Sequence, residues 1–259
     1  MKPVFSPLVV SASQPGERRH AQQLAERCAL ELVDWEQTAD RLVLCVTPER
    51  LELLQRERGR GQPVTVDFSA SLAQARRQEG LRQTLARAAG LKNGQPRPSI
   101  LDATPGLGRD AFILAALGCR VTMVERSPVV HALLEDGLRH AREAGLPEAQ
   151  RLTLALGNAM EWLLSATDQA WEVIYLDPMH PERCKSALVK KELRLLREVV
   201  GADTDGDLLL EAALRRAGQR VVVKRPRLGD PLAGSPPNGV VRGESVRYDL
   251  YFTRHPASA

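Results

Sequence analysis

The chain has 259 residues, of which 43% are hydrophobic, and its 36 Lys and Arg against 32 Asp and Glu give a formal net charge of +4. This length accommodates one large domain, or a catalytic domain with a smaller accessory one. No apolar run approaches the roughly 20 residues needed to cross a bilayer, and the N-terminus lacks a secretory pattern, so we expect a cytoplasmic protein with no membrane association.

The cysteines and histidines give no sign of a metal site. The four cysteines lie singly at positions 28, 45, 119 and 184, without a C-x-x-C pair, and the five histidines are equally dispersed. These spacings favour buried reduced thiols over a disulfide framework or a zinc site. We therefore expect no metal.

The first part of the chain predicts a small α+β domain. Short β-like runs lie at 8–10, 30–33 and 41–46. Thr47 and Pro48 are residue types that cap and open a helix, which predicts a helix through residue 55. A strand at 64–68 and an arginine-rich helical stretch ending at Gly90 are predicted to follow.

The segment 92–98, with two prolines and an Asn-Gly pair, is the best linker in the chain. It predicts an accessory, substrate-guiding domain at 1–95 and a catalytic domain at 96–259. In the second domain we expect strands at 99–103, 120–125, 152–156, 171–176 and 220–224, and helices at 109–117, 128–144, 188–200 and 207–217.

This alternation predicts an α/β fold, with βαβ units on a doubly wound, mostly parallel sheet. Two further β runs, at 239–242 and 245–253, are joined by Gly243 and Glu244. They predict a terminal antiparallel hairpin. A Rossmann-like sheet with such a hairpin is typical of class I methyltransferases rather than of dehydrogenases.

The loop after the first strand of the second domain predicts a cofactor site. Gly106 and Gly108 allow close backbone approach, and the following helix begins with N–H groups available to a carboxylate. The G-x-G-x-x-A pattern fits both NAD and S-adenosylmethionine, so the loop alone does not choose between them.

Polar residues at three successive strand ends favour S-adenosylmethionine. Asp102 precedes the turn, where an acid can hold the amino-acid part of that cofactor. Glu125 can accept both ribose hydroxyls, and Asn158 and Ala159 offer an amide and a backbone N–H to the adenine edge. Each residue taken singly is also explained as a helix cap, a surface acid or a turn residue. Their joint occurrence predicts the cofactor site.

The segment Asp177-Pro178-Met179-His180 directly follows an apolar run. The exocyclic amine of a nucleobase is a poor nucleophile, because its lone pair is delocalised into the ring. The Asp177 side chain and the Pro178 carbonyl can both accept from such an amine and orient its lone pair, and His180 can stack on the extruded base. The alternative is that Asp177-Pro178 only terminates a strand.

The chain resembles the RsmJ-type 16S rRNA (guanine-N2) methyltransferases. Five segments carry the resemblance: DATPGLGRDAF at 102–112, ERSPVV at 125–130, YLDPMHP at 175–181, KSALVKKE at 185–192 and VVVKRP at 221–226. The segment 185–192 is more specific than any general methyltransferase pattern.

The resemblance implies an S-adenosylmethionine-dependent enzyme that methylates N2 of a guanine in the 3′ region of 16S rRNA. It implies cofactor contacts at Arg109, Asp110, Glu125, Arg126, Asn158, Ala159 and Asp177. The family usually has Phe where this chain has His180, which can still stack but can also become charged near neutral pH.

Five basic residues are predicted to position RNA phosphates at the mouth of the pocket: Lys185, Lys190, Lys191, Lys224 and Arg225. Lys190 and Lys191 are also explained as a solvated helix face. The expected partner is 16S rRNA or the small ribosomal subunit. The oligomeric state stays open, with a monomer favoured.

Two other functions remain open from the sequence. One is an NAD(P)-dependent Rossmann oxidoreductase, which shares the glycine loop and Glu125. The other is a non-catalytic RNA-binding protein on a methyltransferase fold. Methylation of DNA or protein amines is chemically allowed by the same tetrapeptide, and only the resemblance favours rRNA.

Overall fold

The computed structural model describes residues 8–39, 41–56, 63–69, 79–165, 171–178, 195–201 and 206–253. The chain divides into two compact units. Unit 1 takes its described residues from Met1–Asp67, Ser127–His140 and Arg183–Ala202, and unit 2 takes its own from Phe68–Arg126, Ala141–Glu182 and Asp203–Ala259.

Unit 1 contains a four-stranded sheet in the order β2-β1-β3-β4. Its elements are β1 (Leu8–Ala12), α1 (Arg18–Cys28), β2 (Glu31–Leu32), β3 (Leu42–Val46) and β4 (Leu51–Gln55), with 3-10 turns at Pro15–Glu17 and Trp35–Thr38. β1 pairs in parallel with β2 and β3, and β3 pairs antiparallel with β4. The three predicted strands are confirmed, and α1 is a helix that the sequence did not predict.

The predicted helix through residue 55 is wrong, because Leu51–Gln55 is strand β4. The Thr47 hydroxyl accepts from Arg50 N at 3.0 Å and donates to Arg50 O at 2.8 Å. Thr47 therefore stabilises the hairpin turn between β3 and β4 and does not cap a helix. The predicted strand at 64–68 is likewise wrong, since the described residues there form a single bridge, between Val64 and Leu53.

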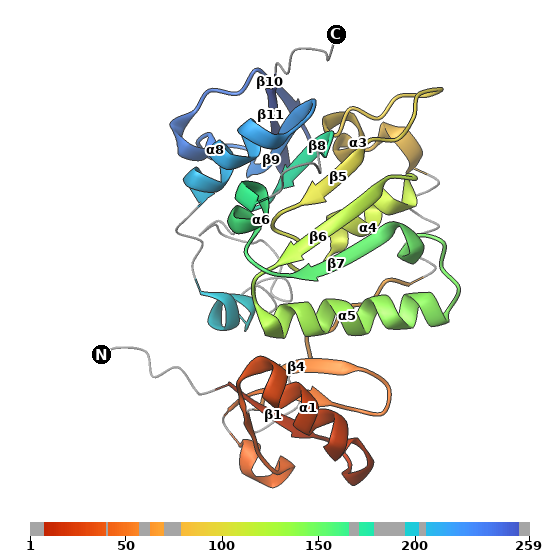
Figure 1. Ribbon diagram of the computed structural model, residues 1–259, viewed down its shortest axis with the longest axis vertical. Helices are drawn as coiled ribbons and strands as arrows, with labels where there is room; N and C mark the ends of the chain where they lie inside the picture. The colour runs from red at the N-terminus through yellow and green to blue at the C-terminus, as the bar shows by residue number, and fades with distance from the viewer. Residues whose placement is uncertain are drawn as a thin grey trace. The chain divides into compact units, whose positions relative to one another are not determined.

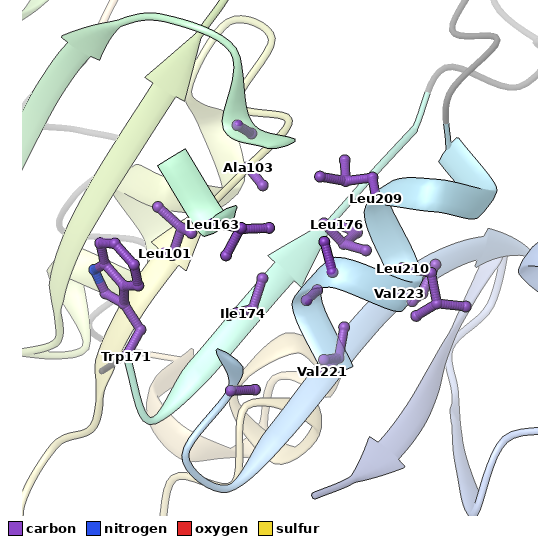
Figure 2. Close-up of a cluster of buried hydrophobic side chains, with 14 of the residues drawn as sticks. Leu101, Ala103, Leu163, Trp171, Ile174, Leu176, Leu209, Leu210, Val221 and Val223 are labelled. Atoms are coloured by element: carbon purple, nitrogen blue, oxygen red, sulfur yellow. The ribbon is translucent and has the colours of Figure 1, made fainter. Parts of the chain in front are cut away.

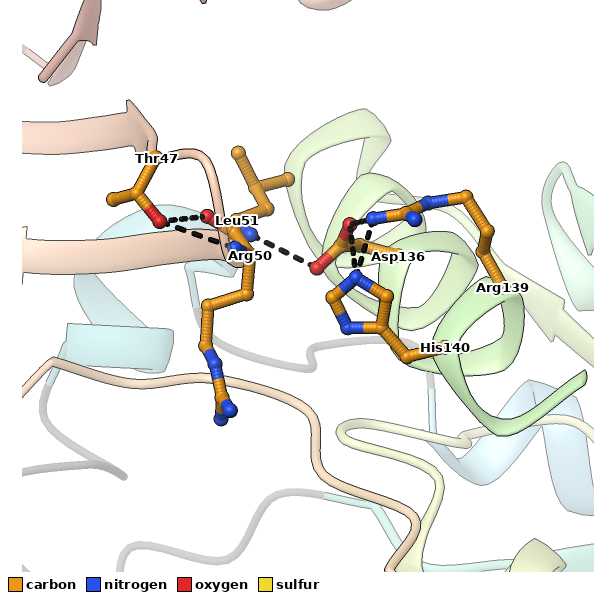
Figure 3. A network of polar contacts seen from close by, with 6 residues as sticks. All are labelled: Thr47, Arg50, Leu51, Asp136, Arg139 and His140. Carbon is orange, nitrogen blue, oxygen red and sulfur yellow. Dashed lines mark hydrogen bonds and ion pairs between the residues drawn. The ribbon is translucent and has the colours of Figure 1, made fainter. Parts of the chain in front are cut away.

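Helix α5 (Pro128–Glu143) contributes its residues up to His140 to unit 1. Figure 3 shows the Asp136 carboxylate accepting from Leu51 N, the first residue of β4, at 2.8 Å. Asp136 also pairs with Arg139 on the next turn of the helix, at 2.7 Å. The Asp136 side chain thus joins α5 to β4.

Unit 2 contains a seven-stranded sheet in the order β10-β11-β9-β8-β5-β6-β7. The strands are β5 (Ser99–Asp102), β6 (Arg120–Glu125), β7 (Leu152–Leu156), β8 (Val173–Leu176), β9 (Arg220–Pro226), β10 (Gly239–Arg242) and β11 (Val246–Phe252). β5 to β9 are parallel, whereas β11 is antiparallel to both β9 and β10. The predicted doubly wound sheet and its terminal hairpin are confirmed.

The helices of unit 2 cover both faces of this sheet (Figure 1). They are α3 (Thr84–Ala88), α4 (Arg109–Ala116), α6 (Ala159–Ser165) and α8 (Gly206–Arg216), with 3-10 turns at Gly80–Arg82, Ala149–Arg151 and Leu232–Gly234. α6 was not predicted. Of the helix predicted at 188–200, residues 195–200 are helical and belong to unit 1, and those before 195 lie outside the described residues.

Figure 2 shows the core beneath α6 and α8, where Leu163, Leu209 and Leu210 pack on Ile174 and Val221. Side chains alternate across a strand, so the neighbouring residues of β8 and β9 point to the opposite face, toward α4. All four residues of β8 are buried because both faces are covered. One face of β8 therefore packs under α6 and α8, and the other packs toward α4, where the Tyr175 hydroxyl contacts Asp110.

The compact units do not follow the boundary predicted between residues 95 and 96. The segment from Phe68 belongs to unit 2, where Phe68 stacks on Phe112 of α4 with ring centroids 4.8 Å apart and α3 contacts β10 and β11. The division at residue 95 stays a prediction about folding units. No helix among the described residues is long and apolar enough to span a membrane.

Candidate active site

The register of the large sheet gathers polar side chains on the face toward α4. Asp102 pairs with Tyr175, and Lys224 pairs with Tyr248. Asp177 follows Tyr175 by two residues, so it points to the same face. Four neighbouring strands thus bring acids, tyrosines and one lysine together at the carboxyl end of the sheet, where open α/β sheets bind their ligands.

Lys224 stands at the centre of this cluster. Its Nζ lies 2.8 Å from Asp110 Oδ2 and 2.9 Å from Asp177 Oδ2. The Tyr175 hydroxyl also donates to Asp110 Oδ2, at 2.5 Å. Asp110 on α4 and Asp177 after β8 are therefore held by one ammonium group.

Thr104, for which the sequence predicts no role, joins the glycine loop to Asp177. Its hydroxyl accepts from Asp177 N at 2.5 Å, and its backbone N–H donates to Asp102 Oδ1 at 3.2 Å. Ala103 N donates to Tyr175 O at 3.1 Å. These bonds fix the start of the loop against the end of β8.

The two loop glycines have the conformation that glycine favours. Gly106 has φ 52° and Gly108 has φ 72°, both in the left-handed region. A Cβ added to Gly106 would meet nothing within 4 Å. The glycine is therefore required by its backbone conformation, and the space beside it is open to a ligand.

The other predicted cofactor residues lie at neighbouring strand ends or at the start of α4. Glu125 is buried at the end of β6, where its carbonyl accepts from Gly157 N at 2.9 Å. Asn158 Oδ1 accepts from Met160 N at 2.9 Å and so caps α6, which begins at the buried Ala159. Arg109 and Arg126 are exposed. These residues share the carboxyl edge of the sheet with the acidic cluster.

Burial and charge act in opposite directions on the ionisable groups. Burial raises the pKa of Asp102 well above its usual range, and the N–H of Thr104 opposes that shift. Burial also raises the pKa of Asp177, and the ammonium of Lys224 lowers it. For Lys224, burial would lower the pKa, but Asp177 and Asp110 outweigh it and the pKa is raised. Lys224 is thus a fixed positive charge among carboxylates.

Asp177 is partly buried, which raises its pKa, but 38% of its side chain is exposed, so a substrate can reach it. Pro178 is buried, and its Cβ lies 3.8 Å from the position that a Cβ would take at Gly206, where α8 begins. Met179 and His180 lie outside the described residues. The part of the tetrapeptide that the structure describes therefore offers a reachable carboxylate next to a buried proline.

The residues predicted to bind phosphate are only partly placed. Arg225 is 5% exposed, and its Nε donates to Asp230 O at 2.8 Å. Lys224 faces carboxylates, as described above. Lys185, Lys190 and Lys191 lie outside the described residues. The two described members of this set therefore have partners within the protein, and any RNA contact by them stays a prediction.

The site fits a cationic cofactor such as S-adenosylmethionine. Asp102 and Asp177 face α4 from the sheet, Asp110 lies opposite them on α4, and Lys224 contacts both Asp110 and Asp177; the open space at Gly106 adjoins the start of α4. An excess of acidic side chains suits a ligand that carries an ammonium and a sulfonium group, because a nearby cation favours their ionised form. Among the described residues, no group of His, Cys, Asp and Glu could hold a metal ion.

Comparison with known proteins agrees with this assignment. Residues 23–253 match the family model described as "Putative SAM-dependent methyltransferase". The ribosomal RNA small subunit methyltransferase J of Nitrosococcus oceani is 50% identical over 240 residues, which cover 90% of this chain and 93% of the relative. The protein of the same name from Coxiella burnetii is 45% identical over 249 residues, covering 95% and 97%.

A solved structure shows the same fold. The crystal structure of a SAM-dependent methyltransferase from Neisseria gonorrhoeae has a TM-score of 0.70 and 34% identity, and covers 97% of each chain. The matches decide against the oxidoreductase, which shared only the glycine loop and Glu125 with the sequence. The chain belongs to the family of S-adenosylmethionine-dependent methyltransferases that includes the ribosomal RNA small subunit methyltransferase J proteins.

Proposed function

We propose that this protein methylates the exocyclic N2 of one guanine in the 3′ region of 16S rRNA, in the cytoplasm. The observation that carries the chemistry is the accessible carboxylate of Asp177, directly after β8. The Thr104 hydroxyl accepts from the backbone N–H of Asp177, and Lys224 binds its carboxylate. The rRNA substrate is supported by the names of the relatives, which match over nearly the whole chain.

The residues of the chain have separate tasks in this reaction. Asp177 accepts a hydrogen bond from the guanine amine, and the Pro178 carbonyl accepts the second, so that the nitrogen lone pair is directed away from the ring plane. His180 stacks on the extruded base. Bound S-adenosylmethionine supplies the electrophilic methyl group.

Asp177 can also accept the proton that the guanine nitrogen releases. The nitrogen that gains the methyl group must lose one proton, and it becomes acidic once it is alkylated. The Asp177 carboxylate can take that proton without being a strong base. Asp102, Asp110, Glu125 and the glycine loop would hold the cofactor, with Arg109, Arg126, Asn158 and Ala159 at its edges.

The test is transfer of tritium from labelled S-adenosylmethionine to 16S rRNA and to intact small subunits, followed by nucleoside analysis. We expect N2-methylguanosine as the only labelled nucleoside. Label in another nucleoside would refute the guanine-N2 assignment, and label in added protein but not in RNA would refute the rRNA substrate.

Asp177→Ala should lower kcat by roughly 100-fold or more and leave RNA affinity nearly unchanged, because it removes the amine acceptor and not a phosphate contact. The control is Glu211→Gln, on an exposed residue of α8 paired with Arg215, which should keep wild-type activity. Unchanged transfer by Asp177→Ala would remove Asp177 from the mechanism. A wild-type protein that binds 16S rRNA and S-adenosylhomocysteine without methylating either substrate would instead favour the non-catalytic reading.

A further inference from the structure

We propose that Lys224 is a positioning residue for methyl transfer, which holds the Asp177 carboxylate ionised and in place beneath the substrate amine. This inference rests on the proposed function, because it gives Asp177 the role of amine acceptor. It replaces the phosphate contact that the basic VVVKRP segment predicts for Lys224.

The backbone of Lys224 is fixed on both sides. β9 lies between β8 and β11, and Lys224 pairs directly with Tyr248 of β11. Leu176 of β8 pairs with Val223, so that Asp177 leaves the sheet beside Lys224. The lysine therefore reaches Asp177 from a strand in the interior of the sheet. This gives its side chain a better defined position than a surface loop would.

Both partners of the ammonium are carboxylates of the site. The side chain of Lys224 is 24% exposed, and its Nζ contacts Asp110 Oδ2 and Asp177 Oδ2 at 2.8 and 2.9 Å. A lysine that served an RNA phosphate would have to leave these partly buried acids without their cation, which is costly. The geometry favours a cation that stays in the protein.

The charge of Lys224 matters because Asp177 faces several other ionisable groups. They are Asp102 of β5, Asp110 of α4, Tyr175 of β8, Arg225 of β9 and Tyr248 of β11. Of these, Asp110 favours a protonated Asp177, whereas Lys224, which contacts its carboxylate at 2.9 Å, and Arg225 oppose that shift. A protonated carboxyl loses acceptor capacity toward the amine.

The sign of the pH effect follows from this. Burial raises the pKa of Asp177 and Lys224 lowers it. Loss of the ammonium therefore raises that pKa further, so the protonated, inactive form persists to higher pH. The acidic limb of the kcat profile should move upward when the charge is removed.

The experiment compares Lys224→Gln, Lys224→Met and Lys224→Arg with wild type between about pH 5.5 and 9 in the tritium-transfer assay. Gln keeps hydrogen-bond donors without the charge, Met removes both, and Arg keeps the charge. Lys92→Met, at an exposed lysine outside the site, is the matched control. RNA affinity and its dependence on salt are measured for each variant.

We expect Lys224→Gln and Lys224→Met to move the acidic limb upward by about one pH unit or more, with RNA affinity and salt dependence unchanged. Lys224→Arg should restore the limb close to its wild-type position, and Lys92→Met should match wild type. A merely structural role would lower kcat at all pH values without moving the limb.

Two results would overturn the proposal. One is a wild-type acidic limb in Lys224→Gln. The other is a loss of RNA affinity and of its salt dependence in Lys224→Gln at unchanged kcat, which would mean that Lys224 contacts RNA phosphates. If Lys224→Met fails to fold, Lys224→Gln decides. An inactive wild-type protein in the same assay would overturn the proposed function itself, and this inference with it.

Discussion

The Thr104 hydroxyl accepts a hydrogen bond from the backbone N–H of Asp177. A substitution that removes this hydroxyl tests that one hydrogen bond. Thr104→Val keeps the shape of the side chain but leaves the Asp177 N–H without its 2.5 Å acceptor. We expect a loss of about 1–3 kcal/mol in the free energy of unfolding, because a polar group loses its partner, and a lower kcat, because Asp177 is less firmly placed. Urea denaturation and the tritium-transfer assay measure the two effects.

Thr104→Ser is the matched control, since it keeps the hydroxyl. It should stay close to wild type in both measurements. If the Val and Ser variants behaved alike, the hydroxyl would contribute nothing, and the orientation of Asp177 would have to come from Lys224 and from the packing of Pro178.

At the scale of residues, the sequence predicted the acids but not their partners. Asp102, Glu125 and Asp177 were found because each directly follows or ends an apolar run. Tyr175 could have been found, because it precedes Asp177 by two residues and so shares its face. The role of Lys224 could not, because it depends on β9 lying beside β8, and sheet order is not visible in local sequence.

At the scale of elements, Asp136 joins α5 to β4 (Figure 3). Its side chain is 11% exposed and accepts from Leu51 N at 2.8 Å. We expect Asp136→Ala to lower the free energy of unfolding by about 1–2 kcal/mol, because the amide at the start of β4 loses its acceptor. Thermal or urea denaturation checks this value.

The neighbouring Glu135 gives the control. Its side chain is 51% exposed and pairs with Arg27, which is 43% exposed. Glu135→Ala should change stability by no more than ~0.5 kcal/mol, since ion pairs between exposed side chains contribute little. Equal losses in the two variants would mean that α5 is sensitive to any lost acid and not to the bond with Leu51.

The same hairpin shows why the N-terminal elements were harder to predict. Residues 51–55 contain three leucines in five positions, and Thr-Pro-Glu before them is typical of a helix start. The alternation of the buried Leu51 and Leu53 with the less buried Glu52 and Leu54 is the strand period, but five residues are too short to separate it from a helical pattern. The antiparallel pairing with β3 makes residues 51–55 a strand.

At the scale of the whole molecule, the large sheet followed closely from the sequence. Its parallel strands are short, mostly apolar runs bounded by turn residues, and most of the helices between them were also predicted. The division into units was not predictable in the same way. Helix α5 contributes to unit 1 although it lies between two strands of unit 2, and a boundary read from a linker assumes that each unit is continuous in sequence.

The distribution of charge predicts how the whole protein binds RNA. The net charge is only +4, and the described active site is rich in acids, so phosphates must be met by basic residues elsewhere. We assign this role to Lys190 and Lys191 of the KSALVKKE segment. Lys190→Ala combined with Lys191→Ala should weaken RNA binding and reduce the slope of log K against log salt by about 1 to 1.5, the value for two phosphates on a single strand.

The control for this pair removes the same charge from another place. Arg215 and Arg216 end α8, and their double Ala variant also lowers the net charge by two. If binding depends on specific phosphate contacts, the lysine pair must lose more affinity and more salt dependence than the arginine pair, while kcat at saturating RNA stays at the wild-type value. Equal losses would mean that only net charge attracts the RNA, and the KSALVKKE segment would then need a different role.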